Sequence, residues 1–195
     1  MPYQNRGKGV SIADLVEIRT RRLVLLSLFL ALGILLYAVE TLFLPPFPLP
    51  GAKLGLTNVV TLMLLIFYSW RECLYNVLAR TILGSLIVGT FLTPAFYLSF
   101  GGALMSTFIM IFIFNRFYGK FSLVGVSLTG STAHNMVQLT LAGALIAHHW
   151  GVLFQAPFLI LIAIPTGAFN GIVATYLVKR LSAGNIDFVR ESWVS

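Results

Sequence analysis

Arg80 is the most unusual residue of this chain, because it interrupts a long apolar run at positions 73–92. An arginine at the centre of a membrane helix costs at least about 2.5 kcal/mol on insertion scales, so its side chain must face protein or water. Asn76, Arg80 and Gly84 are spaced by four residues, which aligns them on one helix face and gives the guanidinium room beside a glycine. Arg80 is therefore the first candidate for ligand binding. A hydrogen-bonding hub that ties helices together is the alternative.

A second set of polar residues recurs at steps of three and four within the apolar run 121–147, namely Ser127, Ser131, His134, Asn135 and Gln138. This spacing predicts a polar stripe on one helix face, turned toward the interior of a bundle. Asparagine and glutamine carry both donors and acceptors, which suits a carbonyl, amide or heteroaromatic ligand, and His134 donates or accepts according to its protonation. Hydrogen bonding between helices is the alternative use of the stripe.

Three more polar residues surround a proline-rich segment that runs from Pro45 to Gly51. Glu40 precedes the segment, Lys53 follows it, and Asn58 lies near the start of the next apolar run. Proline lacks a backbone donor and fixes φ, so the segment should be stiff and extended, and could form a lid or rim over a site. A solvated ion pair of Glu40 and Lys53, which would contribute little, is the alternative.

Residue sets that carry out catalysis are missing from the apolar part of the sequence. The two aspartates, Asp14 and Asp187, lie near the chain ends, so no paired acids are present there to hold magnesium and a diphosphate. The sequence contains no GxxxxGK[ST] motif for ATP and no Ser, His and acid set at plausible depth. His148 and His149 lack further metal ligands at suitable spacing, and the single cysteine, Cys73, is expected to be an apolar filler. We therefore expect binding and transport rather than enzymatic activity, with no metal and no cofactor.

The composition places these residues in a lipid bilayer. Of 195 residues, 58% are hydrophobic and 10% charged, whereas a soluble domain has about a quarter charged residues. At about 20 residues per crossing, this length accommodates roughly six transmembrane helices. The net charge of +7 does not indicate nucleic acid, because the Lys and Arg residues stand between long apolar runs. We place the six spans at 23–44, 54–69, 73–92, 96–115, 121–147 and 153–178.

Basic residues give the orientation of the spans. Of the 13 Lys and Arg residues, all but Lys53 and Arg80 fall on one side of this arrangement. The positive-inside rule then places both termini in the cytoplasm, which requires an even number of crossings. The sequence thus predicts an all-α membrane protein with six transmembrane helices. Its parts are a cytoplasmic or interfacial segment at 1–22, a transmembrane domain at 23–180 and a cytoplasmic tail at 181–195.

Small residues predict where two helices approach closely. They repeat every four positions in the last apolar run, at Ala163, Gly167, Gly171 and Thr175. Ser27 and Ala31 form a weaker pair in the first run, and could serve a neighbouring helix or another subunit. Packing within the bundle is the preferred interpretation.

Several of these segments resemble the Gx transporter family, which is also labelled heptaprenyl diphosphate synthase component I and is similar to the S components of energy-coupling factor (ECF) transporters. The resemblance implies a six-helix S-component fold in the bacterial cytoplasmic membrane. It also implies a substrate bound from the outer side and a partner made of a transmembrane coupling protein and two ATPases. The family's motifs map onto Lys53, Gly55 and Asn58, and onto Ala133, His134, Asn135 and Gln138. The segments that carry the resemblance are Pro50–Asn58, Arg80–Ser85, Gly101–Gly102 and Gly125–Gln138.

The leading hypothesis is an S-component-like subunit that takes up a small organic compound. Arg80 and Lys53 would meet an acidic group, Asn58, Asn135 and Gln138 would orient the ligand, and Glu40 and His134 would complete the site. The rival hypothesis is a membrane subunit that handles an isoprenoid or quinone for a partner enzyme or electron-transfer system. A lateral opening lined by Leu and Phe favours the rival, whereas a closed polar cavity under the proline-rich segment favours uptake.

Overall fold

The computed structural model describes residues 12–43, 55–117 and 120–182, and this part of the chain is entirely helical. Six α-helices account for most of it, as the sequence predicts, and two short turns of π- and 3-10 helix, η1 and η2, connect the last two. In chain order the elements are α1 (Ile12–Phe43), α2 (Asn58–Phe67), α3 (Trp70–Val88), α4 (Pro94–Arg116), α5 (Leu123–Ala142), η1 (Gly143–Ala147), η2 (Trp150–Gln155) and α6 (Ala156–Ser182).

Local sequence signals set several of these helix ends. α3 ends at Gly89, whose φ of +77° is the left-handed conformation that glycine adopts without strain. α4 begins with Pro94 in its first turn, where the missing N–H of proline is harmless. α5 begins after Ser122, whose hydroxyl accepts a 3.1 Å hydrogen bond from the backbone N–H of Gly125.

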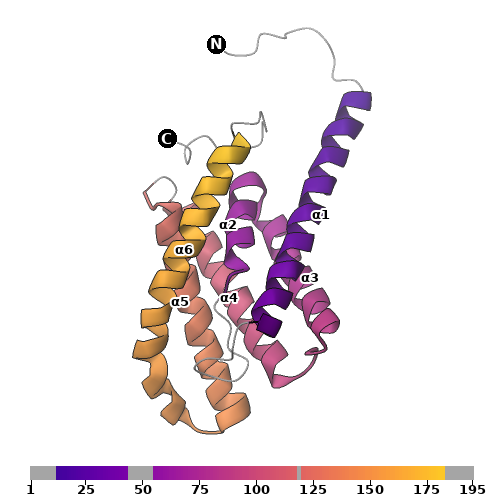
Figure 1. Ribbon diagram of the computed structural model, residues 1–195. Helices are drawn as coiled ribbons and strands as arrows, with labels where there is room; N and C mark the ends of the chain where they lie inside the picture. Colours follow the sequence, from indigo (N-terminus) through magenta and orange to yellow (C-terminus); the bar gives the residue numbers. More distant parts are fainter. Residues whose placement is uncertain (1–11, 44–54, 118–119, 183–195) are drawn as a thin grey trace.

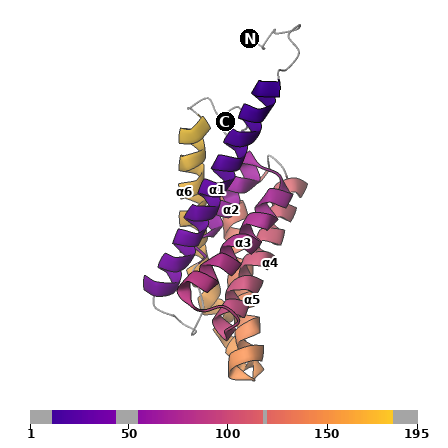
Figure 2. The same ribbon diagram turned by 90° about the vertical axis from the view of Figure 1, so that its right-hand side faces the viewer.

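The helices form an elongated bundle in which α1 begins and α6 ends at the same end (Figure 1). α5 packs most extensively on α4 and α6, while α1 packs mainly on α3. The short helix α2 lies inside the bundle and contacts the five other α-helices (Figures 1 and 2).

Three stretches of the described chain are long and apolar enough to cross a membrane: Leu15–Phe43, Pro94–Arg116 and Trp150–Leu181. They indicate a multi-pass membrane protein. The six crossings and the cytoplasmic position of the termini stay predictions.

The second predicted span, 54–69, is wrong in its extent. Its helix, α2, has 10 residues and is therefore about 15 Å long, about half the thickness of a bilayer's hydrocarbon core. The chain before it turns at Gly55, whose φ is +80°, so the helix begins only at Asn58. The predicted span 121–147 is α-helical to Ala142 and continues as the π-helical turn η1.

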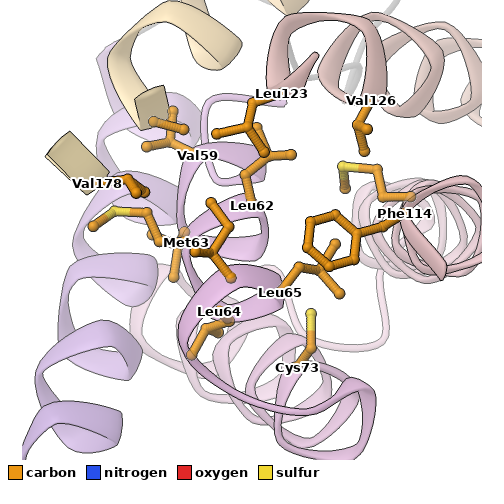
Figure 3. Packing of buried hydrophobic residues seen from close by; sticks show 14 of the residues in the cluster. Val59, Leu62, Met63, Leu64, Leu65, Cys73, Phe114, Leu123, Val126 and Val178 are labelled. Carbon is orange, nitrogen blue, oxygen red and sulfur yellow. The ribbon is translucent and has the colours of Figure 1, made fainter. Parts of the chain in front are cut away.

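The main hydrophobic core surrounds α2. Every residue from Asn58 to Ile66 is buried, as expected for a helix that is apolar on all sides. Figure 3 shows its side chains packed against Phe114 of α4, Val126 of α5 and Val178 of α6. Cys73 also lies in this cluster and is completely buried, which agrees with its expected role as an apolar filler.

The small residues of α6 allow its close approach to α5. A Cβ atom added to Gly167 would lie 2.9 Å from the Cα of Leu128, and one added to Gly171 would lie 2.5 Å from the Cα of Val124. Such distances leave no room for a side chain, so the predicted packing within the bundle is confirmed at this pair of helices.

Candidate functional site

The candidate site is built around irregular backbone at the start of α2. We call residues 55–58 the α2 turn. Gly55, Thr57 and Asn58 are buried in it, and the backbone N–H of Asn58 donates to the carbonyl of Gly55 at 2.9 Å. Away from water, the other backbone groups of such a turn need partners, since an unsatisfied one is costly. Buried polar side chains of the neighbouring helices provide them.

Glu40 of α1 binds the N–H groups of the turn. Its carboxylate accepts hydrogen bonds from the backbone N–H groups of Gly55 and Leu56. The residue is 3% exposed, so it is not the solvated group of the alternative interpretation. A carboxylate near the first turn of a helix also interacts favourably with the helix dipole. Lys53 and the segment from Pro45 to Gly51 lie outside the described residues.

Arg80 of α3 binds the same turn from another side. Its guanidinium donates from Nη1 to the carbonyl of Thr57 at 2.8 Å and from Nη2 to the hydroxyl of Thr61 at 2.9 Å. Arg80 is completely buried, and among the described residues its Nε has no hydrogen-bond partner. These two bonds support the hub interpretation of Arg80, because they join α3 to the start of α2. A direct contact of Arg80 with a ligand stays a prediction.

The glycine that accommodates Arg80 comes from α1 and not from its own helix. A Cβ added to Gly33 would lie 3.0 Å from the Cδ of Arg80, whereas one added to Gly84 would meet the ring of Tyr37 at 2.7 Å. The expectation that Gly84 gives the guanidinium room is therefore wrong. The shared face of Asn76, Arg80 and Gly84 is confirmed, since all three lie against α1.

Asn170 of α6 completes the set of side chains that hold the turn, and the sequence analysis missed it. Its Nδ2 donates to the carbonyl of Gly55 at 3.0 Å, and the residue is completely buried. The signal that could have revealed it is an amide side chain in a long apolar helix, where burying a polar group without a hydrogen-bond partner costs free energy.

Asn58 and His134, a residue of the polar stripe on α5, lie near each other at Gly55. The Oδ1 of Asn58 accepts a hydrogen bond from the hydroxyl of Ser106 on α4 at 3.4 Å. The ring of His134 comes within 3.8 Å of the position that a Cβ of Gly55 would occupy. A Cβ on Gly102 would lie 3.0 Å from both His134 and the Cγ of Gln138, so this glycine lets α4 approach the stripe.

The remaining residues of the stripe face α6. Asn135 donates from Nδ2 to the carbonyl of Leu159 at 3.1 Å, which ties α5 to α6 away from the turn. Ser127 and Ser131 are completely buried beside Gly171 and Gly167, and their hydroxyls have no hydrogen-bond partner among the described residues. The stripe is thus buried, as predicted; His134 lies beside Asn58 at Gly55, and Gln138 lies beside His134 at Gly102.

A family model described as heptaprenyl diphosphate synthase component I matches residues 29–177. The chain belongs to this family. No curated protein and no solved structure matches it. The matched range includes all the side chains that hold the α2 turn, and in the described residues no group of three His, Cys, Asp or Glu residues could hold a metal ion.

A separate groove lies between α1 and α3 in the family member described here. It has a volume of about 240 Å³, and its walls include Leu23, Leu26 and Leu30 of α1 and Tyr75, Asn76 and Ala79 of α3. Asn76 is 5% exposed, and its Oδ1 has no hydrogen-bond partner in the described part of the chain. The groove is therefore mostly apolar, with the Oδ1 of Asn76 as a buried acceptor and with Ser27 and Glu72 also in its wall.

Proposed function

We propose that this protein is the substrate-binding membrane subunit of an uptake system for a small organic compound, similar to an S component of an ECF transporter. One observation carries the proposal: buried polar side chains from all six α-helices meet at irregular backbone inside an apolar bundle. These residues are Glu40, Asn58, Arg80, Ser106, His134 and Asn170.

Broken helices support this function on physical grounds. In membrane transporters, substrates bind near the bilayer midplane where a discontinuous helix exposes backbone groups and a helix end. α2 is a half-length helix whose N-terminus lies among the middle parts of α3, α4, α5 and α6. Non-helical backbone at this depth is tolerated only where protein or a cavity surrounds it.

The proposed roles differ between the side chains. Arg80 and Glu40 hold the α2 turn in place, while Asn58, His134 and Gln138 offer hydrogen bonds to the substrate. Lys53 and the proline-rich segment would cover the site from the outer side. We propose no catalytic step, because the described residues place no pair of acids beside the turn for prenyl diphosphate chemistry.

The proposed orientation has six crossings, with both chain ends in the cytoplasm. The helix ends that meet where α1 begins and α6 ends (Figure 1) are rich in basic residues, which fits the positive-inside rule. ATP hydrolysis and the movement of the subunit would come from a coupling protein and two ATPases on that side. The basic residues of this end in the described helices are Arg19, Arg21, Arg22, Arg71, Arg116, Lys179 and Arg180.

Purification of the tagged full chain from the membranes of its own source cells tests this proposal. We expect an integral membrane protein and P-loop ATPases to co-purify, and their amounts to fall when the tag is placed on an unrelated membrane protein. Co-purification of a soluble prenyl-transferring enzyme in place of ATPases would refute the uptake function.

That second outcome would favour another candidate function, the handling of an isoprenoid or quinone for a partner enzyme. The groove between α1 and α3 is the observation in its favour, since three leucines line it. The family's description also names a prenyl diphosphate synthase.

A further inference from the structure

Two buried amide atoms beside the α2 turn lack partners and complement one another. The Nδ2 of Asn58 is a donor and the Oδ1 of Asn170 is an acceptor, and neither has a hydrogen-bond partner among the described residues. Both residues are completely buried. Buried polar atoms in folded proteins are nearly always paired, so each of these atoms calls for a partner that the described chain does not contain.

Both atoms lie at Gly55. The Nδ2 of Asn58 is 3.0 Å from the position that a Cβ of Gly55 would occupy, and the amide of Asn170 is bonded to the carbonyl of Gly55 at 3.0 Å. That bond fixes the orientation of Asn170, because only its NH₂ can donate to a carbonyl, which leaves the oxygen as the open group. The unpaired Nδ2 of Asn58 on α2 and the unpaired Oδ1 of Asn170 on α6 therefore reach the same small region.

The charged side chains of the site, Arg80 and Glu40, already form hydrogen bonds to the α2 turn and to the start of α2. Both terminal nitrogens of Arg80 donate to residues of α2, and Glu40 accepts from the N–H groups of Gly55 and Leu56. The two side chains carry opposite charges, so together they contribute no net charge to the site. Moving a charged ligand from water into this site would be costly without an opposite charge to pair with it, whereas an uncharged ligand needs no such partner.

Resting on the uptake function proposed above, we propose that the substrate is an uncharged compound with a carbonyl next to an N–H on one edge, as in a lactam, carboxamide or cyclic urea. The ligand carbonyl accepts from Asn58, and the adjacent N–H donates to Asn170. This substrate class replaces the acidic group expected from the sequence.

The first test needs no variant. The full chain is purified in mild detergent, the small molecules that it retains are released by denaturation, and mass spectrometry in both polarities identifies them. We expect a compound at a near-stoichiometric amount that is uncharged at pH 7 and has such an edge. Retention of a carboxylate or phosphate that is lost in Lys53→Ala would overturn the substrate class and leave the uptake function standing.

Substitution of the donor gives the second test. Asn58→Asp keeps the shape of the side chain and the oxygen that accepts from Ser106, but replaces the unpaired Nδ2 donor with an acceptor. The amount of compound that the protein retains should therefore fall at least about tenfold. Asn76→Asp is the matched control, since it introduces the same charge at a buried amide in the wall of the groove between α1 and α3. An equal loss in both variants would overturn the assignment to Asn58. A wild-type protein that retains no compound would contradict the uptake function itself.

Discussion

Replacement of Arg80 should separate a structural role from a binding role. In Arg80→Ala, the carbonyl of Thr57 and the hydroxyl of Thr61 lose a charged donor, and the carboxylate of Glu40 stays buried beside the same turn. A hydrogen bond to a charged group contributes about 1.5 to 3 kcal/mol, so two bonds give about 3 to 6 kcal/mol. Arg80→Ala also removes the free-energy cost of burying the guanidinium, which offsets part of this loss. Removing one partner of a buried charged network lowers the free energy of unfolding by about 3 to 5 kcal/mol.

The assay is thermal unfolding of the purified chain in detergent. A loss of about 3 kcal/mol corresponds to a fall in Tm of about 6 to 12 °C for a chain of this size. Arg22→Ala is the matched control, because Arg22 is an exposed arginine whose ion pair with Glu72 lies at the surface and contributes about 0 to 1 kcal/mol. If Arg80→Ala unfolds at the same temperature as Arg22→Ala but no longer retains the compound, the hub role is refuted and Arg80 is a binding residue.

Three other substitutions test the packing and the turn. Gly171→Val should sharply lower the yield of monodisperse protein in size-exclusion chromatography, since its side chain would collide with the backbone of Val124. Asn135→Leu should lower stability by about 1 to 2 kcal/mol in thermal unfolding without changing the retained compound, because its bond to Leu159 lies away from the turn. Glu40→Leu should destabilise by about 2 to 3 kcal/mol in the same assay and increase hydrogen exchange at the α2 turn, because two buried N–H groups lose their acceptor.

Controls and contrary outcomes follow from the same contacts. Gly89→Asn should leave the yield unchanged, since no atom lies within 4 Å of an added Cβ there and asparagine tolerates the positive φ. A normal yield of Gly171→Val would contradict the close approach of α5 and α6. Loss of the retained compound in Asn135→Leu at unchanged stability would place Asn135 in the site after all.

The sequence predicts the helical class and most helix positions, because apolar runs of membrane length have few other solutions. It also predicts the buried stripe on α5 and the contact at Gly167 and Gly171, since both follow from helical periodicity alone. The truncation of α2 was missed because a run of apolar residues does not reveal that Gly55 adopts a positive φ and that the backbone leaves the helix there.

The partners of the polar residues were not predictable from one helix at a time. Periodicity shows that Arg80 and Gly84 share a face, but which glycine meets the guanidinium depends on how α1 lies on α3. The bond from Asn170 to Gly55 joins residues far apart in the chain, and no local pattern encodes it. Sequence reasoning left Arg80 open between a ligand and a hub that ties helices together, because it could not identify backbone acceptors such as the carbonyl of Thr57.

The half-length of α2 has a consequence for the order in which the protein is assembled at the ribosome. Three side chains hold the α2 turn, and they come from an early helix, α1, from the next helix, α3, and from the last helix, α6. Until α6 has been synthesised and inserted, the carbonyl of Gly55 has no side-chain donor from that helix. The set of side-chain contacts that holds the α2 turn is therefore complete only after the last helix has been synthesised.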